Sequence, residues 1–127
     1  MPFTYSIEGR LIHFRWSGTL TRDDLQAMGA AMPQLAQQVS RATGRSPQVL
    51  HDFGAVEMCE FPPIAAYEHS LRRRTVPIPE PVKSAIVATP TGGRAMARVF
   101  QALNRNENLV MELFDTEADA RAWLGAE

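Results

Sequence analysis

A glycine-containing turn, Thr89-Pro90-Thr91-Gly92-Gly93-Arg94, is the strongest candidate for ligand binding in this sequence. Two glycines allow the backbone to approach a ligand closely, and a helix beginning there offers unpaired amides to an anion. Arg94 adds a guanidinium that can fork onto a carboxylate or phosphate. The competing interpretation is structural, with the glycines shaping a strand-to-helix turn that Thr91 caps. We expect a small anionic ligand at Thr91, Gly92, Gly93 and Arg94.

A second candidate begins at His51-Asp52 and continues to Glu57, Cys59 and Glu60, so that acid, base and thiol share one segment. We expect His51 and Asp52 at the carboxyl end of an inner strand, where open α/β sheets bind ligands. Adjacent strand residues point to opposite faces, so both reach one site only if the strand ends between them. His51 and Asp52 are therefore predicted as ligand-binding residues and not as catalytic ones. A small enzyme using His51 to Glu60 is an alternative.

The other chemically capable residues predict no catalytic or metal site. His51, Glu57 and Cys59 have no recognised metal-ligand spacing, and no cofactor is expected. His13 is predicted on the open face of a hairpin and His69 at a polar helix position, neither with a Ser or Cys partner. Arg72 to Arg74 are predicted to be a solvated basic helix end, with contact to an acidic partner or an anionic membrane surface as the alternative.

The elements that would position these residues begin with a hairpin and a long helix. Two alternating apolar runs flank Gly9-Arg10, which predicts antiparallel strands. Thr21 then caps a helix, with Asp24 completing a short capping box. Pro33 predicts a kink in that helix, or two abutting helices. Its core stripe consists of Leu25, Met28, Met32, Leu35 and Val39.

The second half of the chain alternates strands and helices. A buried strand over Val49 to Phe53 is followed by a predicted loop, Gly54 to Glu60, and by a helix beginning near Pro62. Strands follow at Val82 to Thr89 and Leu109 to Phe114, and Thr116 caps a terminal helix. The predicted core positions of the three helices are Ile64, Tyr67 and Leu71; Met96, Val99, Phe100 and Leu103; and Ala120, Trp123 and Leu124.

These elements predict a single α/β domain over residues 1–127 with the order ββαβαβαβα. Crossover helices require parallel neighbours, so the five-stranded sheet is expected to be mixed and mostly parallel, with the first strand antiparallel. Four helices complete the fold.

Composition excludes several classes of protein. The chain has 127 residues with 13 Lys+Arg against 14 Asp+Glu, which gives a formal net charge of -1. Nucleic-acid binding depends on clustered cations, so no nucleic-acid partner is expected. No apolar run reaches the roughly 20 residues of a transmembrane helix, and residues 1–10 lack a signal-peptide pattern, so we expect a cytoplasmic protein.

The order of elements resembles the SpoIIAA-like branch of the STAS family, which is related to anti-sigma-factor antagonists. The matching residues are the opening hairpin, Gly18 to Asp24, Leu50 to Phe53, and Ala118 to Leu124. The resemblance implies a non-catalytic module that binds a partner protein, a nucleotide or a small ligand. Signalling members carry a phosphorylatable Ser or Thr after strand three, whereas Gly54 to Pro63 here contains no hydroxyl, so that switch does not transfer.

The combined prediction is a STAS-like module that binds a small anionic ligand or a protein partner. The alternatives are the small enzyme and a lipid-handling module of CRAL-TRIO-like type, which requires an apolar cavity or patch. A homodimer is also expected, because the outer strand Phe3 to Glu8 offers unpaired backbone groups and carries one charge, Glu8.

Overall fold

The computed structural model describes residues 3–74, 76–89 and 93–125. Its elements follow the order ββαβαβαβα, which confirms the prediction. They are β1 (Phe3–Glu8), β2 (Leu11–Thr21), α1 (Arg22–Thr43), β3 (Gln48–Glu60), α2 (Pro63–Arg74), β4 (Val82–Val87), α3 (Arg94–Leu103), β5 (Leu109–Phe114) and α4 (Glu117–Gly125).

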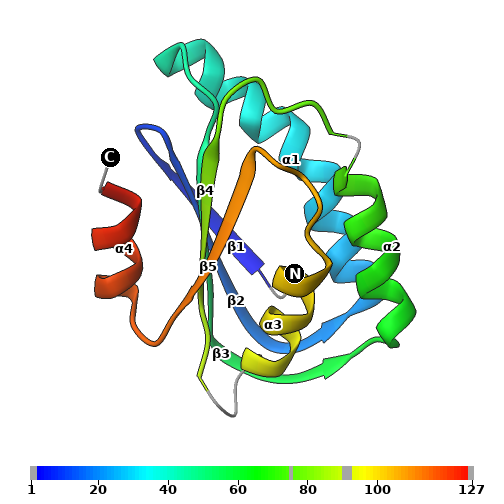
Figure 1. Cartoon of the computed structure of the whole chain (residues 1–127). Coiled ribbons are helices and arrows are strands. Elements are labelled where there is room, and N and C mark those ends of the chain that lie inside the picture. Colours follow the sequence, from blue (N-terminus) through cyan, green and yellow to red (C-terminus); the bar gives the residue numbers. More distant parts are fainter. Residues whose placement is uncertain (1–2, 75, 90–92, 126–127) are drawn as a thin grey trace.

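The sheet has the strand order β1-β2-β3-β4-β5, so β3 is the central strand. β1 pairs antiparallel to β2, and the other three pairs are parallel. Helices α1, α2 and α3 cover one face, and α4 alone covers the other (Figure 1). The crossovers β2–α1–β3, β3–α2–β4 and β4–α3–β5 explain this, because each parallel connection must return across a face of the sheet.

Helix α1 begins at the predicted cap. The Thr21 hydroxyl accepts a hydrogen bond from the Asp24 amide, and the Thr21 amide donates to the Asp24 carboxylate at 2.7 Å. The helix runs through Pro33 as one element and ends at Gly44, whose φ of 72° is left-handed, so the alternative of two abutting helices is wrong. No helix in the described part of the chain has the combined length and hydropathy of a membrane span.

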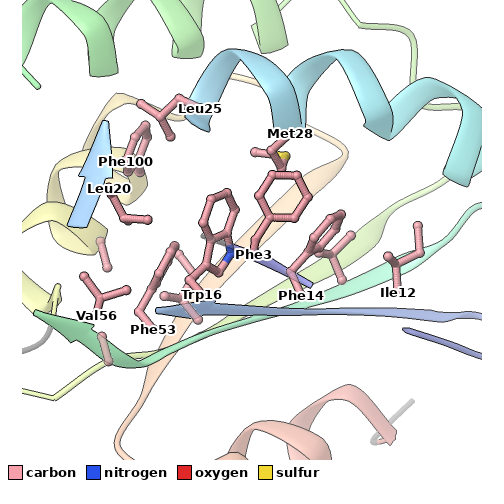
Figure 2. Packing of buried hydrophobic residues seen from close by; sticks show 14 of the residues in the cluster. Phe3, Ile12, Phe14, Trp16, Leu20, Leu25, Met28, Phe53, Val56 and Phe100 are labelled. Carbon is pink, nitrogen blue, oxygen red and sulfur yellow. The ribbon is translucent and has the colours of Figure 1, made fainter. Parts of the chain in front are cut away.

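An aromatic core joins the hairpin to α1 (Figure 2). Phe3 lies 4.8 Å from Trp16 and 5.8 Å from Phe14, measured between ring centroids, and these rings lie beneath Leu25 and Met28 of α1. Phe3 is only 7% exposed. Phe3 of the outer strand therefore belongs to the core.

Strand β3 is longer than the sequence predicts. The segment Gly54 to Glu60, predicted as a loop, continues the strand and pairs with β2 as far as Thr21. The ladder shifts register between Gly18 and Thr19, and Gly18 has a φ of 70°. Such irregularities interrupt the alternation of apolar and polar residues, and this removes the sequence signal for a strand.

A smaller core lies between α4 and the opposite face of the sheet. The Thr116 hydroxyl caps the helix by accepting a hydrogen bond from the Asp119 amide at 3.1 Å, as predicted. Trp123 packs 5.5 Å from Phe114, measured between ring centroids. The buried members of this core are Leu50, Ala85, Val87, Ala120 and Leu124.

Candidate functional site

Arg94, which was predicted to bind an anion at the turn before α3, already has partners within the protein. Thr91 and Gly92 lie outside the described residues, whereas Gly93 is the N-cap of α3 with a φ of 85°. Arg94 donates through Nη2 to the Ala88 carbonyl at 3.2 Å and forms an ion pair with Asp115. An anion at this turn would therefore compete with the Asp115 carboxylate for the guanidinium.

His51 and Asp52 do not share a site. They lie within the long strand β3 rather than at its end, although the pairing with β4 stops at Asp52 opposite Val87. His51 faces the layer of α1, α2 and α3, where it contacts aromatic side chains, and Asp52 faces α4. The expected carboxyl-end position is wrong, while the expected opposite orientation of the two side chains is confirmed.

His51 is held in an aromatic stack. Its ring lies nearly parallel to Phe14 and Phe53, with centroid distances of 5.2 and 5.9 Å. Its Nδ1 accepts a hydrogen bond from the Trp16 indole N–H at 3.1 Å, so the neutral ring carries its proton on Nε2. Burial, with smaller effects of nearby Arg73, His69 and His13, lowers the pKa of His51 to about 3. His51 is therefore neutral at physiological pH.

Helix α2 presents a different face to the sheet from the predicted one. Ile64, Tyr67 and Leu71 are exposed by 52%, 45% and 37%, so their assignment to the core is wrong. The inward face carries Ala65, Ala66 and Ser70, which are buried. Spacings of three and four identify a stripe along a helix but not its direction, and here the stripe of small residues packs inward.

The inward face of α2 also carries an arginine with buried, unpaired nitrogens. Nε and Nη2 of Arg73 are inaccessible to solvent and have no hydrogen-bond partner among the described residues. The same is true of the buried Ser70 hydroxyl one helical turn earlier. Arg73 as a whole is partly buried. Burial lowers its pKa to about 10, with no carboxylate among the causes. The prediction that Arg72 to Arg74 form a solvated basic end is therefore wrong at Arg73.

His69 borders the same region. Its ring packs edge-on against Phe100 of α3, with a centroid distance of 5.6 Å. Burial, followed by the charges of Arg73 and Arg72, lowers the pKa of His69 to about 4. We call His51, His69, Ser70 and Arg73 the α2 cluster. Its two imidazoles are neutral at pH 7 and its guanidinium is charged, so the cluster offers hydrogen-bond donors and a net positive charge.

Asp52 belongs to a second cluster on the opposite face of the sheet, with His13 of β2 and Glu117 of α4. One ligand atom from each residue lies within 4.8 Å of the other two. His13 is completely buried, so its predicted place on an open, wet face is wrong. Burial is the main cause that lowers the pKa of His13. We call His13, Asp52 and Glu117 the α4 cluster.

Arg121 connects the α4 cluster to the hairpin. Its Nε donates to Glu117 Oε2 at 3.0 Å, and its Nη1 donates to Glu8 Oε2 at 2.8 Å. Its Nη2 lies 3.2 Å from His13 Nδ1. Because a guanidinium can only donate, Nδ1 accepts and the neutral His13 ring carries its proton on Nε2.

Cys59 is unsuited to nucleophilic chemistry. It lies on β3 rather than in a loop, with its Sγ 3.4 Å from the Met96 sulfur. Burial raises the pKa of its thiol, which disfavours the reactive thiolate. Glu57 and Glu60 of the same segment are exposed.

Two surface hollows lie away from both clusters. One, of about 590 Å³, is lined by polar side chains of α1 such as Gln34 and Gln38. The other, of about 400 Å³, lies beside Arg10, Arg45 and Lys83. Glu80 accepts hydrogen bonds from both arginines, and Lys83 donates to the Trp123 carbonyl at 2.8 Å. The cations of the second hollow are thus already paired.

The model of the SpoIIAA-like family matches residues 11–125. The chain belongs to the SpoIIAA-like family. This confirms the resemblance seen in the hairpin, the capped first helix and the terminal helix. Comparison with the curated proteins finds no match.

Two solved structures show the same SpoIIAA-like fold. An uncharacterized protein of the DUF3478 family from Shewanella loihica PV-4 is 17% identical, with a TM-score of 0.56, over 96% of this chain and 91% of that one. The anti-sigma factor antagonist SpoIIAA in its unphosphorylated form is 16% identical, with a TM-score of 0.57, over 98% of this chain and 99% of that one. At these identities the likeness concerns the fold alone.

Proposed function

We propose that this member of the SpoIIAA-like family is a non-catalytic module that binds a small organic anion at the α2 cluster. The observation that carries the proposal is Arg73, whose Nε and Nη2 are buried with no hydrogen-bond partner from the residues that the structure describes. Removing a charge from water costs several kcal/mol unless the charge is paired. A bound carboxylate or phosphate would provide the missing partner through charge-assisted hydrogen bonds.

The neighbours of Arg73 fit the same ligand class. Ser70 has a buried hydroxyl without a partner, and His51 and His69 are neutral rings that can each donate a hydrogen bond. Phe100 packs against His69, and Phe14 and Phe53 stack on His51, so aromatic surface adjoins the polar groups. This combination favours an anion with an apolar body over a fully hydrated inorganic ion.

The arrangement favours binding over catalysis. A nucleophile requires an adjacent base within hydrogen-bond reach, and the His51 Nδ1 is occupied by the Trp16 indole N–H. Ser70 has no hydrogen-bond partner to activate its hydroxyl. His51 and His69, with pKa values of about 3 and 4, are weak bases.

Titration with sodium benzoate and sodium phosphate at constant ionic strength, followed by ¹H–¹⁵N NMR, tests this proposal. We expect benzoate to shift the Ser70 amide signal in the wild type and in Arg74→Met, but not in Arg73→Met. The Arg73 Nε–H signal should also shift in the two proteins that retain Arg73. Arg74 is a matched control because it is exposed in the same helical turn. Absence of these shifts in the wild type, or the same shifts in Arg73→Met, would overturn the proposal.

The same titration separates the α2 cluster from the turn before α3, which remains our alternative location for the anion. Binding at that turn would first move the amide signal of Gly93, because the first amides of a helix have no intrahelical partner. It would also depend on Arg94, which must leave Asp115. Arg94→Met would then abolish the shifts and Arg73→Met would not.

A lipid-handling function is the second candidate, and the outer face of α2 favours it. Ile64, Tyr67 and Leu71 form an exposed apolar stripe there. Flotation with vesicles of phosphatidylcholine and phosphatidylglycerol tests this directly. If the protein handles lipid, the wild type should float with the vesicles and Tyr67→Ser should reduce this co-flotation. A wild-type protein that stays at the bottom of the gradient would exclude lipid handling.

A further inference from the structure

The α4 cluster joins three elements beneath the terminal helix, on the face of the sheet opposite the α2 cluster (Figure 1). His13 comes from β2, Asp52 from β3 and Glu117 from α4, and their ligand atoms all lie within 4.8 Å of one another. Three residues so distant in sequence are brought together only by the fold. One imidazole with two carboxylates is a donor set that divalent metal ions accept.

His13 provides the independent observation. Its side chain is completely buried, and its Nε2, inaccessible to solvent, has no hydrogen-bond partner in the described part of the chain. Nε2 lies 3.6 Å from Glu117 Oε1, which is too long for a good hydrogen bond. Two ligand atoms at about 2.1 Å from a tetrahedral zinc ion lie about 3.4 Å apart. The spacing therefore fits two atoms that share a cation better than two that share a proton.

We propose that His13, Asp52 and Glu117 form a divalent cation site of the zinc class, with at least one coordination position open to water or to a ligand. The imidazole favours zinc over magnesium or calcium, which prefer oxygen ligands alone. Side-chain exposure of 43% at Glu117 gives an entry route from solvent. The site is independent of the proposed anion binding, which takes place on the other face.

Arg121 competes with the cation. In the cation-free state its Nη2 donates to His13 Nδ1, which leaves the ring proton on Nε2, the nitrogen that must bind the metal. Loading requires that this proton leaves Nε2 while Nδ1 takes one up, so the ring stays neutral and changes tautomer. Arg121 Nη2 must then withdraw toward Glu8, whose Oε1 lies 3.5 Å away. Removing the guanidinium should strengthen cation binding.

Calorimetric titration with zinc sulfate, with His13 ring ¹⁵N shifts as a second readout, tests the site. We expect one zinc ion per chain and a change of His13 from the Nε2–H to the Nδ1–H tautomer. Asp52→Asn and Glu117→Gln should each weaken binding at least about tenfold, the scale of losing a metal ligand or its support. Glu107→Gln is the control, since Glu107 is exposed and outside the cluster. Arg121→Gln should bind zinc more tightly.

Two outcomes would overturn the proposal. The first is the absence of zinc binding in the wild type. The second is binding that Asp52→Asn and Glu117→Gln leave unchanged, because zinc would then occupy another donor such as Cys59 or His69. Circular dichroism of both variants checks that they fold, and both positions are partly exposed, so neither substitution opens a cavity in the core.

Discussion

Replacing Arg73 by Met should stabilise the protein in the absence of a ligand, although Arg73 is a partly buried residue. Met replaces the apolar stem of Arg as far as the Nε position, and it needs no hydrogen-bond partner. Breaking an ion pair would have the opposite effect, because it would leave the partner charge unpaired. Arg73 has no such partner for Nε and Nη2. Its removal therefore ends a desolvation cost without creating a new one.

The size of this stabilisation follows from the pKa of Arg73. Burial lowers the pKa of Arg73 to about 10, well below the ordinary value of an arginine, and each unit corresponds to about 1.4 kcal/mol. The charged form is therefore destabilised by about 3 kcal/mol in the folded state. At pH 7 both the folded and unfolded chains carry the proton, so the full cost is present. It would be relieved only as the pH rises above about 10. Partial solvent access reduces the expected net gain to about 2 kcal/mol.

Arg74→Met is the matched control in urea denaturation at pH 7. Both arginines lie in the last turn of α2, where their positive charge interacts favourably with the negative end of the helix dipole. This contributes about 0.3 to 1 kcal/mol, which either substitution removes. Arg74 is exposed, so its loss should slightly lower the free energy of unfolding. Arg73→Met should raise it. If the free energy of unfolding of Arg73→Met were more than about 1 kcal/mol below that of the wild type, Arg73 would have a stabilising partner and the reasoning would be refuted.

Three further predictions concern acid, core packing and association. His51 and His69, whose pKa values are lowered to about 3 and 4, take up protons mainly in the unfolded chain, so stability should fall as the pH drops below about 6.5. Ring ¹⁵N shifts should show His51 neutral at pH 5, and titration near 6.5 would contradict its burial. Leu35→Ala should cost about 2 to 5 kcal/mol in urea denaturation, and a loss below about 0.5 would mean that α1 faces the sheet differently. Light scattering should report a homodimer, since β1 (Phe3–Glu8) pairs only with β2 and leaves one edge open, whereas a strict monomer would exclude it.

The order of elements could be predicted because hydrophobic periodicity and capping are local signals. Thr21 and Thr116 cap their helices as predicted, and the strand Leu109 to Phe114 has the predicted bounds. The second half of β3 was missed because its partner is the irregular end of β2. Register shifts around Gly18 disturb the alternation on which strand prediction depends.

Apart from His51 and Asp52, the members of the two clusters were not predicted as site residues, for a different reason. A stripe at Ile64, Tyr67 and Leu71 looks like a core face, and only the packing of Ala66 against the sheet decides that Arg73 points inward instead. His13 alternates with apolar Ile12 and Phe14, as an exposed strand residue would. Its burial depends on α4, which arrives more than 100 residues later. Tertiary packing, which no local pattern encodes, determines both outcomes.

The dipeptide His51-Asp52 places one residue in each cluster, which makes the independence of the two sites testable. Adjacent residues of the central strand point to opposite faces, so the positive α2 cluster and the acidic α4 cluster lie on either side of one sheet. The lowered pKa of Arg73 has burial as its cause, and neither Asp52 nor Glu117 offsets it. Each cluster therefore needs its own counter-ion. Asp52→Asn should leave benzoate binding unchanged, and Arg73→Met should leave zinc binding unchanged. Loss of both ligands in either variant would mean that the clusters act as one site across the sheet.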